Sequence, residues 1–187
     1  MNIKQPAWAG FLLLMVSSVG AQPFEGITVD SLSFSLGQGQ GDADIYRIGM
    51  QNNWSRSWFN EGDWHVSGYW NLEAGHWHSN KRGGHEDNVF ELALTPVFRL
   101  EQKSANTGHV SPYLEGGIGL HLIGPTSIGD RSLSSAFQLG SHVGAGIRFG
   151  EQGKYDLGYR YQHISNSSLD QPNDGLDLHT ISFGMNY

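Results

Sequence analysis

The feature that most constrains this sequence is a hydrophobic period of two residues. From Phe137 to Phe149, most odd positions are apolar, whereas the even positions are small or polar. Such alternation places every second side chain on the same face of a β-strand. The pattern recurs in segments beginning near Tyr155 and Leu176, and at the apolar positions Leu32, Phe34 and Leu36; Tyr46, Ile48, Met50 and Trp54; Trp64, Val66, Trp70 and Leu72; Phe90, Leu92, Leu94, Phe98 and Leu100; and Leu114, Ile118, Leu120 and Leu122. The sequence therefore predicts eight strands, most of them long enough to cross a bilayer when tilted.

Eight alternating strands are compatible with a soluble, lipocalin-like barrel or with an outer-membrane barrel. The polar face separates the two, because small residues and charges of both signs suit the narrow interior of an eight-stranded barrel. The charged members of that face are Arg47, Glu91, Arg99, Glu115, Arg148, Asp156 and Arg160. We therefore expect an all-β fold, an eight-stranded antiparallel transmembrane up-and-down β-barrel, with its apolar face toward lipid. The alternating, aromatic C-terminal segment favours the same fold.

The N-terminal segment resembles an export signal. Lys4 precedes an apolar run that is shorter than the roughly 20 residues of a membrane-spanning helix. Val19 and Ala21 supply the small residues of a signal-peptidase site. We expect a signal peptide at residues 1–21 and a mature barrel domain at residues 22–187, located in the bacterial outer membrane.

Charge and cysteine content exclude several classes of protein. The formal net charge is -7 and no cluster of Lys or Arg is present, which argues against nucleic-acid binding. The absence of cysteine excludes a disulfide scaffold and a thiolate zinc site. A metal site at His76, His78 and His85, with Glu86 and Asp87 beside them, remains an alternative to a solvated loop, but no third ligand has a fixed spacing. We expect no metal site.

The connections predict the orientation of the barrel. With both termini in the periplasm, the short connection Gly150–Lys154 is a periplasmic turn. The longer segments are then external loops, namely Ser79–Asp87, Ile123–Ser134 and Ser167–Gly175. The tryptophans are expected in the aromatic girdles at the membrane interfaces: Trp54, Trp58, Trp64, Trp70 and Trp77.

Polar residues interrupt the lipid-facing parity near the external end of the last hairpin. Continuing the apolar parity of the strand from Tyr155 reaches His163 and Ser165, and that of the final strand reaches His179 and Asp177. If Tyr155 pairs with Tyr187, Ser165 lies opposite Asp177, and His163 is a diagonal neighbour of Asp177. A serine becomes nucleophilic when a histidine takes its proton and an acid orients that histidine.

These residues therefore predict a possible serine nucleophile at Ser165, with His163 as base and Asp177 as acid. His179 competes as the base because it shares the same face. By itself the His-x-Ser pattern also fits a merely polar loop rim, so both interpretations stay open at this point.

The run from His163 to Asp177 closely resembles the signature of the lipid A 3-O-deacylases, the PagL family of Gram-negative outer membranes. It carries the pattern HxSNxxLxxPNxG, ending at Gly175. The resemblance implies an esterase that removes the 3-position 3-hydroxyacyl chain of lipid A in lipopolysaccharide, without a metal or cofactor. It also implies Ser165 as nucleophile and His163 as general base. Residues that hold the oxyanion or position the substrate are then expected among Asn173, Asn166 and Gly175.

One position departs from the family pattern. The acid of the family is typically Glu, whereas Asp177 is one methylene shorter. Either the final strand lies closer to His163, or Asp174 or solvent shares the orienting role. The expected partners are lipopolysaccharide and outer-membrane lipids, and a homodimer remains open. The alternative function is that of a non-enzymatic small barrel used in adhesion or envelope structure.

Overall fold

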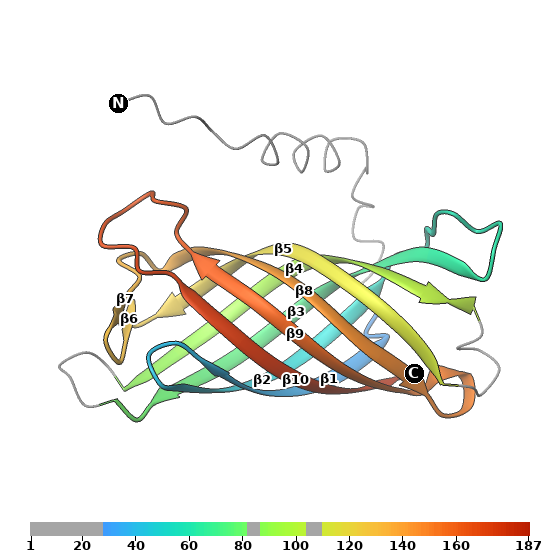
Figure 1. Cartoon of the computed structure of the whole chain (residues 1–187), viewed down its shortest axis with the longest axis horizontal. Coiled ribbons are helices and arrows are strands. Elements are labelled where there is room, and N and C mark those ends of the chain that lie inside the picture. The colour runs from blue at the N-terminus through green and yellow to red at the C-terminus, as the bar shows by residue number, and fades with distance from the viewer. Residues whose placement is uncertain (1–27, 82–86, 104–109) are drawn as a thin grey trace.

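The computed structural model describes residues 28–81, 87–103 and 110–187, in which eight long strands form one closed barrel (Figure 1). Around the barrel each strand pairs antiparallel with its neighbours, and β10 pairs with β1 to close the sheet. The barrel strands are β1 (Ser31–Gly39), β2 (Ala43–Asn53), β3 (Trp64–Ser79), β4 (Asn88–Gln102), β5 (Ser111–Gly124), β8 (Phe137–Phe149), β9 (Tyr155–Ser165) and β10 (Leu176–Asn186). The predicted eight-stranded antiparallel barrel is confirmed.

The two ends of the barrel differ in their connections (Figure 1). The β1–β2, β5–β8 and β9–β10 connections gather at one end, where β3 also ends and β4 begins, here called the loop end. Within the β5–β8 connection, β6 (Ser127–Ile128) and β7 (Arg131–Ser132) form a short hairpin. The C-terminus lies at the opposite end, as does the tight β8–β9 turn with its 3-10 helix η2 (Glu151–Gly153).

The signal-peptide prediction falls on residues outside those described. Across residues 28–81, 87–103 and 110–187, no helix is long and apolar enough to cross a membrane.

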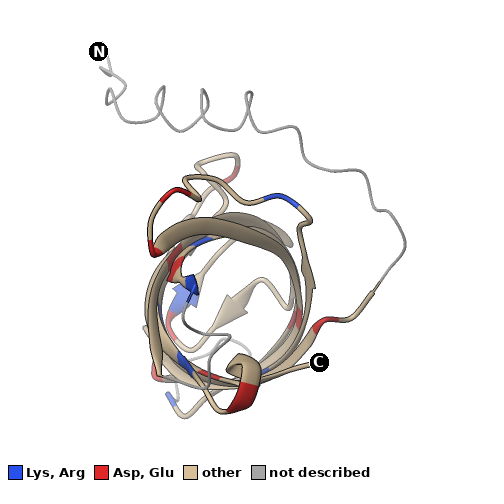
Figure 2. Ribbon diagram, turned by 90° about the vertical axis from the view of Figure 1, so that its right-hand side faces the viewer, with Lys and Arg blue, Asp and Glu red and all other residues tan. Residues whose placement is uncertain are grey.

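The two faces of the barrel wall follow the predicted parity. Apolar side chains are exposed on the outer face, among them Leu32, Phe34, Leu36, Ile48, Leu92, Leu120, Val143, Ile181 and Phe183. The lumen holds buried ion pairs that join several strands: Arg47–Glu91, Arg99–Glu115, Arg99–Asp156 and Arg160–Glu115. Figure 2 looks along the barrel and shows basic and acidic positions spread around the single ring of strands. Mutual neutralisation of these charges satisfies groups that could not otherwise remain ionised inside a narrow barrel.

The lumen becomes apolar toward the loop end. Ile128, at the end of β6, and Leu133, just after β7, are fully buried there, because the hairpin folds over the barrel opening. They join a cluster of buried residues that lines the lumen just below: Ala43, Ile45, Trp77, Val89, Ile123, Ile164, Leu176 and Leu178. This cluster closes the loop end and supports the connections above it through apolar contact.

The girdle prediction is wrong for Trp77. Its side chain is fully buried in the lumen, where the indole Nε1 donates a hydrogen bond of 2.9 Å to Glu91 Oε2. Trp77 has inward parity on β3, so the alternation of the sequence correctly predicts that its side chain points into the lumen. Trp54 instead packs on the outer face near the opposite end of the barrel, with ring contacts to Trp58, Trp70 and Phe98.

Candidate active site

The β9–β10 hairpin has a different register from the expected one. Asp177 lies directly opposite His163, and Met185, rather than Tyr187, lies opposite Tyr155. The predicted pairing of Ser165 with Asp177 is therefore wrong by two residues. At the other end of the hairpin, the backbone N–H of Asn186 donates to Lys154 O at 2.8 Å, which continues the observed register, and the N–H of Tyr187 donates to Asp30 O at 3.0 Å, which continues the pairing of β10 with β1.

The corrected register brings a histidine and a carboxylate into contact on the outer wall. His163 Nδ1 lies 2.7 Å from Asp177 Oδ1, and the two side chains are 49% and 30% exposed. Direct cross-strand neighbours are closer than diagonal ones, so the shorter aspartate side chain spans the gap without an extra methylene. The direct pairing of Asp177 with His163 is therefore consistent with an aspartate in place of the longer glutamate.

Asp174, the other candidate for orienting His163, instead binds the backbone of Ser132. Its Oδ2 accepts the backbone N–H of Ser132 at 2.8 Å, and its own N–H donates to Ser132 O at 3.1 Å. The hydroxyl of Ser134 donates to Pro172 O nearby. The hairpin formed by β6 and β7 thus fixes the β9–β10 connection by polar contacts as well as by its buried Leu133.

Ser165 lies two residues beyond His163 on β9, at the last residue of the strand, and is half-buried. Residues i and i+2 of a strand share a face, about 6 to 7 Å apart along the backbone, so Ser165 has the same outward parity as His163. Because His163 Nδ1 is bonded to Asp177, the ring nitrogen left for a proton from a serine is Nε2.

Gly175 packs against the same imidazole. It has a positive φ of 61°, which L side chains rarely adopt, and an added Cβ would lie 3.0 Å from His163 Cε1 and 3.4 Å from Nε2. A side chain at this position would therefore both strain the backbone and crowd the nitrogen that faces the site.

The two asparagines of the motif differ in their surroundings. The Asn166 side chain is buried, and its Nδ2 donates to Leu133 O and Asp170 O, each at 3.0 Å. Its backbone N–H donates to Asn173 Oδ1 at 3.3 Å. Asn173 is half-buried, and this contact occupies the oxygen of its amide while leaving the NH₂ group as a donor. The Asn166 side chain thus shapes the connection, whereas Asn173 offers polar hydrogens beside Ser165.

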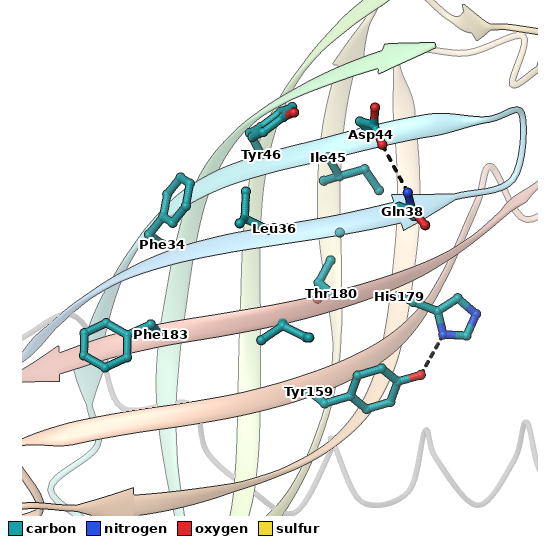
Figure 3. Close-up of a pocket in the computed structure, with 12 residues that line it drawn as sticks. Phe34, Leu36, Gln38, Asp44, Ile45, Tyr46, Tyr159, His179, Thr180 and Phe183 are labelled. Carbon is teal, nitrogen blue, oxygen red and sulfur yellow. Dashed lines mark hydrogen bonds between the residues drawn. The ribbon is translucent and has the colours of Figure 1, made fainter. Parts of the chain in front are cut away.

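An elongated cavity of about 610 Å³ runs along the outer wall beside this hairpin (Figure 3). It is lined mainly by apolar and aromatic side chains of β1, β2, β9 and β10, including Phe34, Leu36, Tyr46, Tyr159, Ile181 and Phe183. A smaller polar hollow at the loop end is lined by Gln38, Gly39, Gln40, Tyr161, Asp177 and His179. Gln38 and His179 line both, so an apolar path on the wall is continuous with the polar site above it.

His179, the competing base, has a different hydrogen-bond partner. Its Nδ1 lies 2.6 Å from the Tyr159 hydroxyl, as Figure 3 shows, and its ring packs against Tyr161 with centroids 5.2 Å apart. The carboxylate of Asp177 instead pairs with His163. The geometry therefore favours His163 over His179 as the residue oriented by an acid.

The loop histidines do not form a metal site in the described part of the chain. Within residues 28–81, 87–103 and 110–187, no group of three His, Asp or Glu side chains could hold a metal ion. His76 packs against Phe90, and His78 Nδ1 lies 3.1 Å from Asn88 Oδ1. His85 and Glu86, which the sequence suggested as further ligands, lie outside the described residues.

One residue at this site could not be identified from the sequence. Gln40, in the turn after β1, donates its side-chain Nε2 to Asp177 Oδ2 at 3.1 Å. The two residues are 137 positions apart, and only the pairing of β1 with β10 brings them together. In the sequence, Gln38 and Gln40 continue the outward parity of Leu32, Phe34 and Leu36, but this parity does not indicate that Gln40 contacts Asp177.

Comparison with known proteins identifies close relatives of this fold and site. A sequence model of the family "Lipid A 3-O-deacylase (PagL)" matches residues 44–186. The chain is 28% identical over 172 residues to the lipid A deacylase PagL of Pseudomonas aeruginosa, covering 92% of this chain and 93% of that protein. It is 30% identical over 177 residues to the lipid A deacylase PagL of Bordetella bronchiseptica, with coverages of 92% and 89%. A crystal structure of the outer-membrane enzyme PagL superposes with a TM-score of 0.74 at 27% identity, covering 84% of this chain and 99% of that one.

Proposed function

The chain belongs to the lipid A 3-O-deacylase (PagL) family, and from this premise we propose that it is an outer-membrane hydrolase that removes the 3-O-linked acyl chain of lipid A. Residues 1–21 would serve as the export signal, and residues 22–187 as the barrel enzyme. The match to a solved outer-membrane enzyme and the exposed apolar belt of the barrel support this location.

Ser165, His163 and Asp177 are proposed as the catalytic triad. The observation that carries this assignment is the 2.7 Å contact between His163 Nδ1 and Asp177 Oδ1 on the outer wall, with Ser165 on the same face of β9. The carboxylate holds the imidazole in the tautomer that has a free Nε2 lone pair, which can accept the proton of the serine hydroxyl.

The reaction proceeds in two steps on these residues. Ser165 Oγ attacks the ester carbonyl as His163 Nε2 takes its proton, and the resulting imidazolium protonates the departing sugar oxygen. Water then attacks the acyl-serine, gives a proton to His163, and releases the fatty acid as Ser165 regains its hydrogen. Each bond broken is matched by one formed, so the triad needs no cofactor for ester hydrolysis.

The tetrahedral intermediates carry a negative oxygen that needs donors. The NH₂ group of Asn173 is proposed as one donor, because its amide oxygen is already bonded to the Asn166 backbone. The buried Asn166 side chain and the tightly packed Gly175 act by fixing the connection around that donor.

Access from the side of the barrel fits a lipid substrate. The triad pair is exposed on the outer wall, and the polar hollow at Asp177 continues into the apolar groove on that wall. An acyl chain can then remain in an apolar environment while its ester stays at the polar rim. The closed apolar cluster inside the loop end leaves the lumen unsuited to this role.

Mass spectrometry of lipid A tests the proposal. Membranes from cells expressing the wild-type chain are expected to contain lipid A that lacks one 3-O-linked acyl chain. Ser165→Ala and His163→Ala should restore the full mass while the barrel keeps its heat-resistant mobility in detergent. Unchanged lipid A with the folded wild-type protein would overturn the proposal and favour a non-enzymatic barrel.

A further inference from the structure

Gln40 makes two contacts with one residue of the final strand. Its backbone N–H donates to Asp177 O at 3.1 Å, and its side-chain Nε2 donates to Asp177 Oδ2, also at 3.1 Å. The backbone contact continues the β1–β10 pairing by one residue beyond Gly39 and Leu178. The side-chain contact adds a hydrogen bond from the Gln40 amide to the Asp177 carboxylate. A residue of the β1–β2 turn thus contacts the carboxylate of Asp177 on β10.

The turn that carries Gln40 is itself held in place. Gly41 and Asp42 adopt positive φ angles of 78° and 56°, which form the tight connection between β1 and β2. Gly41 O accepts the hydroxyl of the buried Ser79 at 2.6 Å. Gln40 therefore begins from a fixed backbone, so its amide loses little freedom when it bonds the carboxylate.

The donors around Asp177 are divided between its two oxygens. Oδ1 faces His163 Nδ1, and Oδ2 faces Gln40 Nε2. The Tyr161 hydroxyl, on the same outer face of β9, also interacts electrostatically with the carboxylate. Without a donor on Oδ2, the short aspartate side chain could rotate about χ2 and direct its charge away from His163, because that torsion is broad.

We propose that Gln40 is a positioning residue of the esterase, which acts through Asp177 by holding its carboxylate toward His163. This inference rests on the proposed function. It also explains how an aspartate meets the orienting requirement here: cross-strand proximity brings it within reach, and the glutamine fixes the direction in which it points.

Steady-state kinetics on purified protein with lipopolysaccharide in detergent micelles tests this role. Gln40→Ala is expected to lower kcat about five- to tenfold, the scale of one charge-assisted hydrogen bond, with KM within about twofold. Gln40→Glu keeps the shape of the side chain but cannot donate, and it adds a charge beside Asp177. Its kcat should therefore fall below that of Gln40→Ala.

The matched control is Asn80→Ala. Asn80 is also an exposed amide at the loop end that donates to an aspartate, with Nδ2 3.2 Å from Asp44 Oδ2, but it has no contact with Asp177. Its kcat is expected to equal that of the wild type. A fall as large as that of Gln40→Ala would mean that any loosening of the rim impairs turnover, and would overturn the specific role of Gln40.

A double-mutant cycle separates positioning from general support. In an Asp177→Asn background, adding Gln40→Ala should change kcat by less than about twofold, since the charge that Gln40 holds is gone. Full additivity, or an unchanged kcat in Gln40→Glu, would overturn the inference. If Gln40→Ala lost its heat-resistant fold, Gln40→Glu would decide alone. Activity retained by Ser165→Ala would instead refute the proposed triad, which is a separate outcome.

Discussion

Two of the histidine–carboxylate pairs in the described part of the barrel have nearly equal lengths but opposite environments. Inside the lumen, His121 Nδ1 lies 2.6 Å from Glu91 Oε1, and both side chains are fully buried. On the outer wall, His163 Nδ1 lies 2.7 Å from Asp177 Oδ1, and both side chains are partly exposed. Distance alone would therefore give the two pairs the same chemistry.

The partners of the two pairs differ in a way that matters for the proposed catalytic role of the outer one. Glu91 also binds Arg47 and Trp77, and His121 Nε2 faces Gln162, so every polar atom of that pair is used inside the barrel. His163 Nε2 instead lies beside Gly175, and Ser165 is two residues further along the same strand. The inner pair stabilises the fold by neutralising buried charge, whereas the outer pair leaves a nitrogen for a reacting proton.

The largest expected effect is the loss of activity on substitution in the outer pair and its serine. Ser165→Ala and His163→Ala should each lower kcat by about 10⁴-fold, as in other Ser-His-acid hydrolases. Their unfolding in detergent should match that of the wild type, because both side chains lie at the rim. Kinetics on lipopolysaccharide checks this, and His121→Gln provides the comparison: its turnover per folded molecule should stay within a few-fold of the wild type.

The next effect concerns stability rather than turnover. Glu91→Ala leaves Arg47 and His121 buried without their carboxylate, which should cost about 3 to 5 kcal/mol of unfolding free energy. Urea titration in detergent micelles measures this loss. Asp177→Ala should shift the same transition by less than about 1 kcal/mol, because exposed pairs contribute little. Equal destabilisation by the two variants would erase the contrast between the pairs.

A smaller effect is expected at Gly175. An alanine there must adopt the positive φ of 61° and lies within 3.4 Å of His163 Nε2, so kcat should fall about tenfold through displacement of the ring. The control is Gly62→Ala, since an added Cβ at Gly62 meets nothing within 4 Å. Normal kinetics in Gly175→Ala would show that the space beside Nε2 is not required.

The smallest effect should come from changing the length of the acid. Asp177→Glu keeps the carboxylate but adds a methylene to a gap that the direct pairing already closes, so kcat should stay within about tenfold of the wild type. Asp177→Ala removes the charge and should cost at least about 10²-fold. The ratio of the kcat values of Asp177→Glu and Asp177→Ala measures how much the role of residue 177 depends on its negative charge. The ratio of wild-type to Asp177→Glu kcat measures how much it depends on the length of the side chain.

Much of the architecture could be predicted from the sequence because parity is a local property. The outward Leu36, Ile48 and Phe183 and the inward Arg99 and Glu115 follow from counting residues in steps of two. The outward positions of His163 and Asp177 came from the same count. The error at Trp77 arose because its residue type was given more weight than its parity.

The register of the last hairpin could not be derived in this way. A shift of two residues leaves every side chain on the same face, so the alternation of β10 is equally consistent with Ser165 or His163 opposite Asp177. In the structure, β10 is paired on both sides up to its end: Asn186 N–H donates to Lys154 O at 2.8 Å, and Tyr187 N–H donates to Asp30 O at 3.0 Å.

The sequence by itself thus determined the strands, their faces and the short run that contains the proposed nucleophile, since each depends on neighbouring residues. The tertiary structure alone decided that Asp177 lies directly opposite His163, that Gln40 binds Asp177, and that Ile128 and Leu133 close the loop end. These features require segments far apart in the chain to meet when the barrel closes, and a local hydrophobic period carries no information about such meetings.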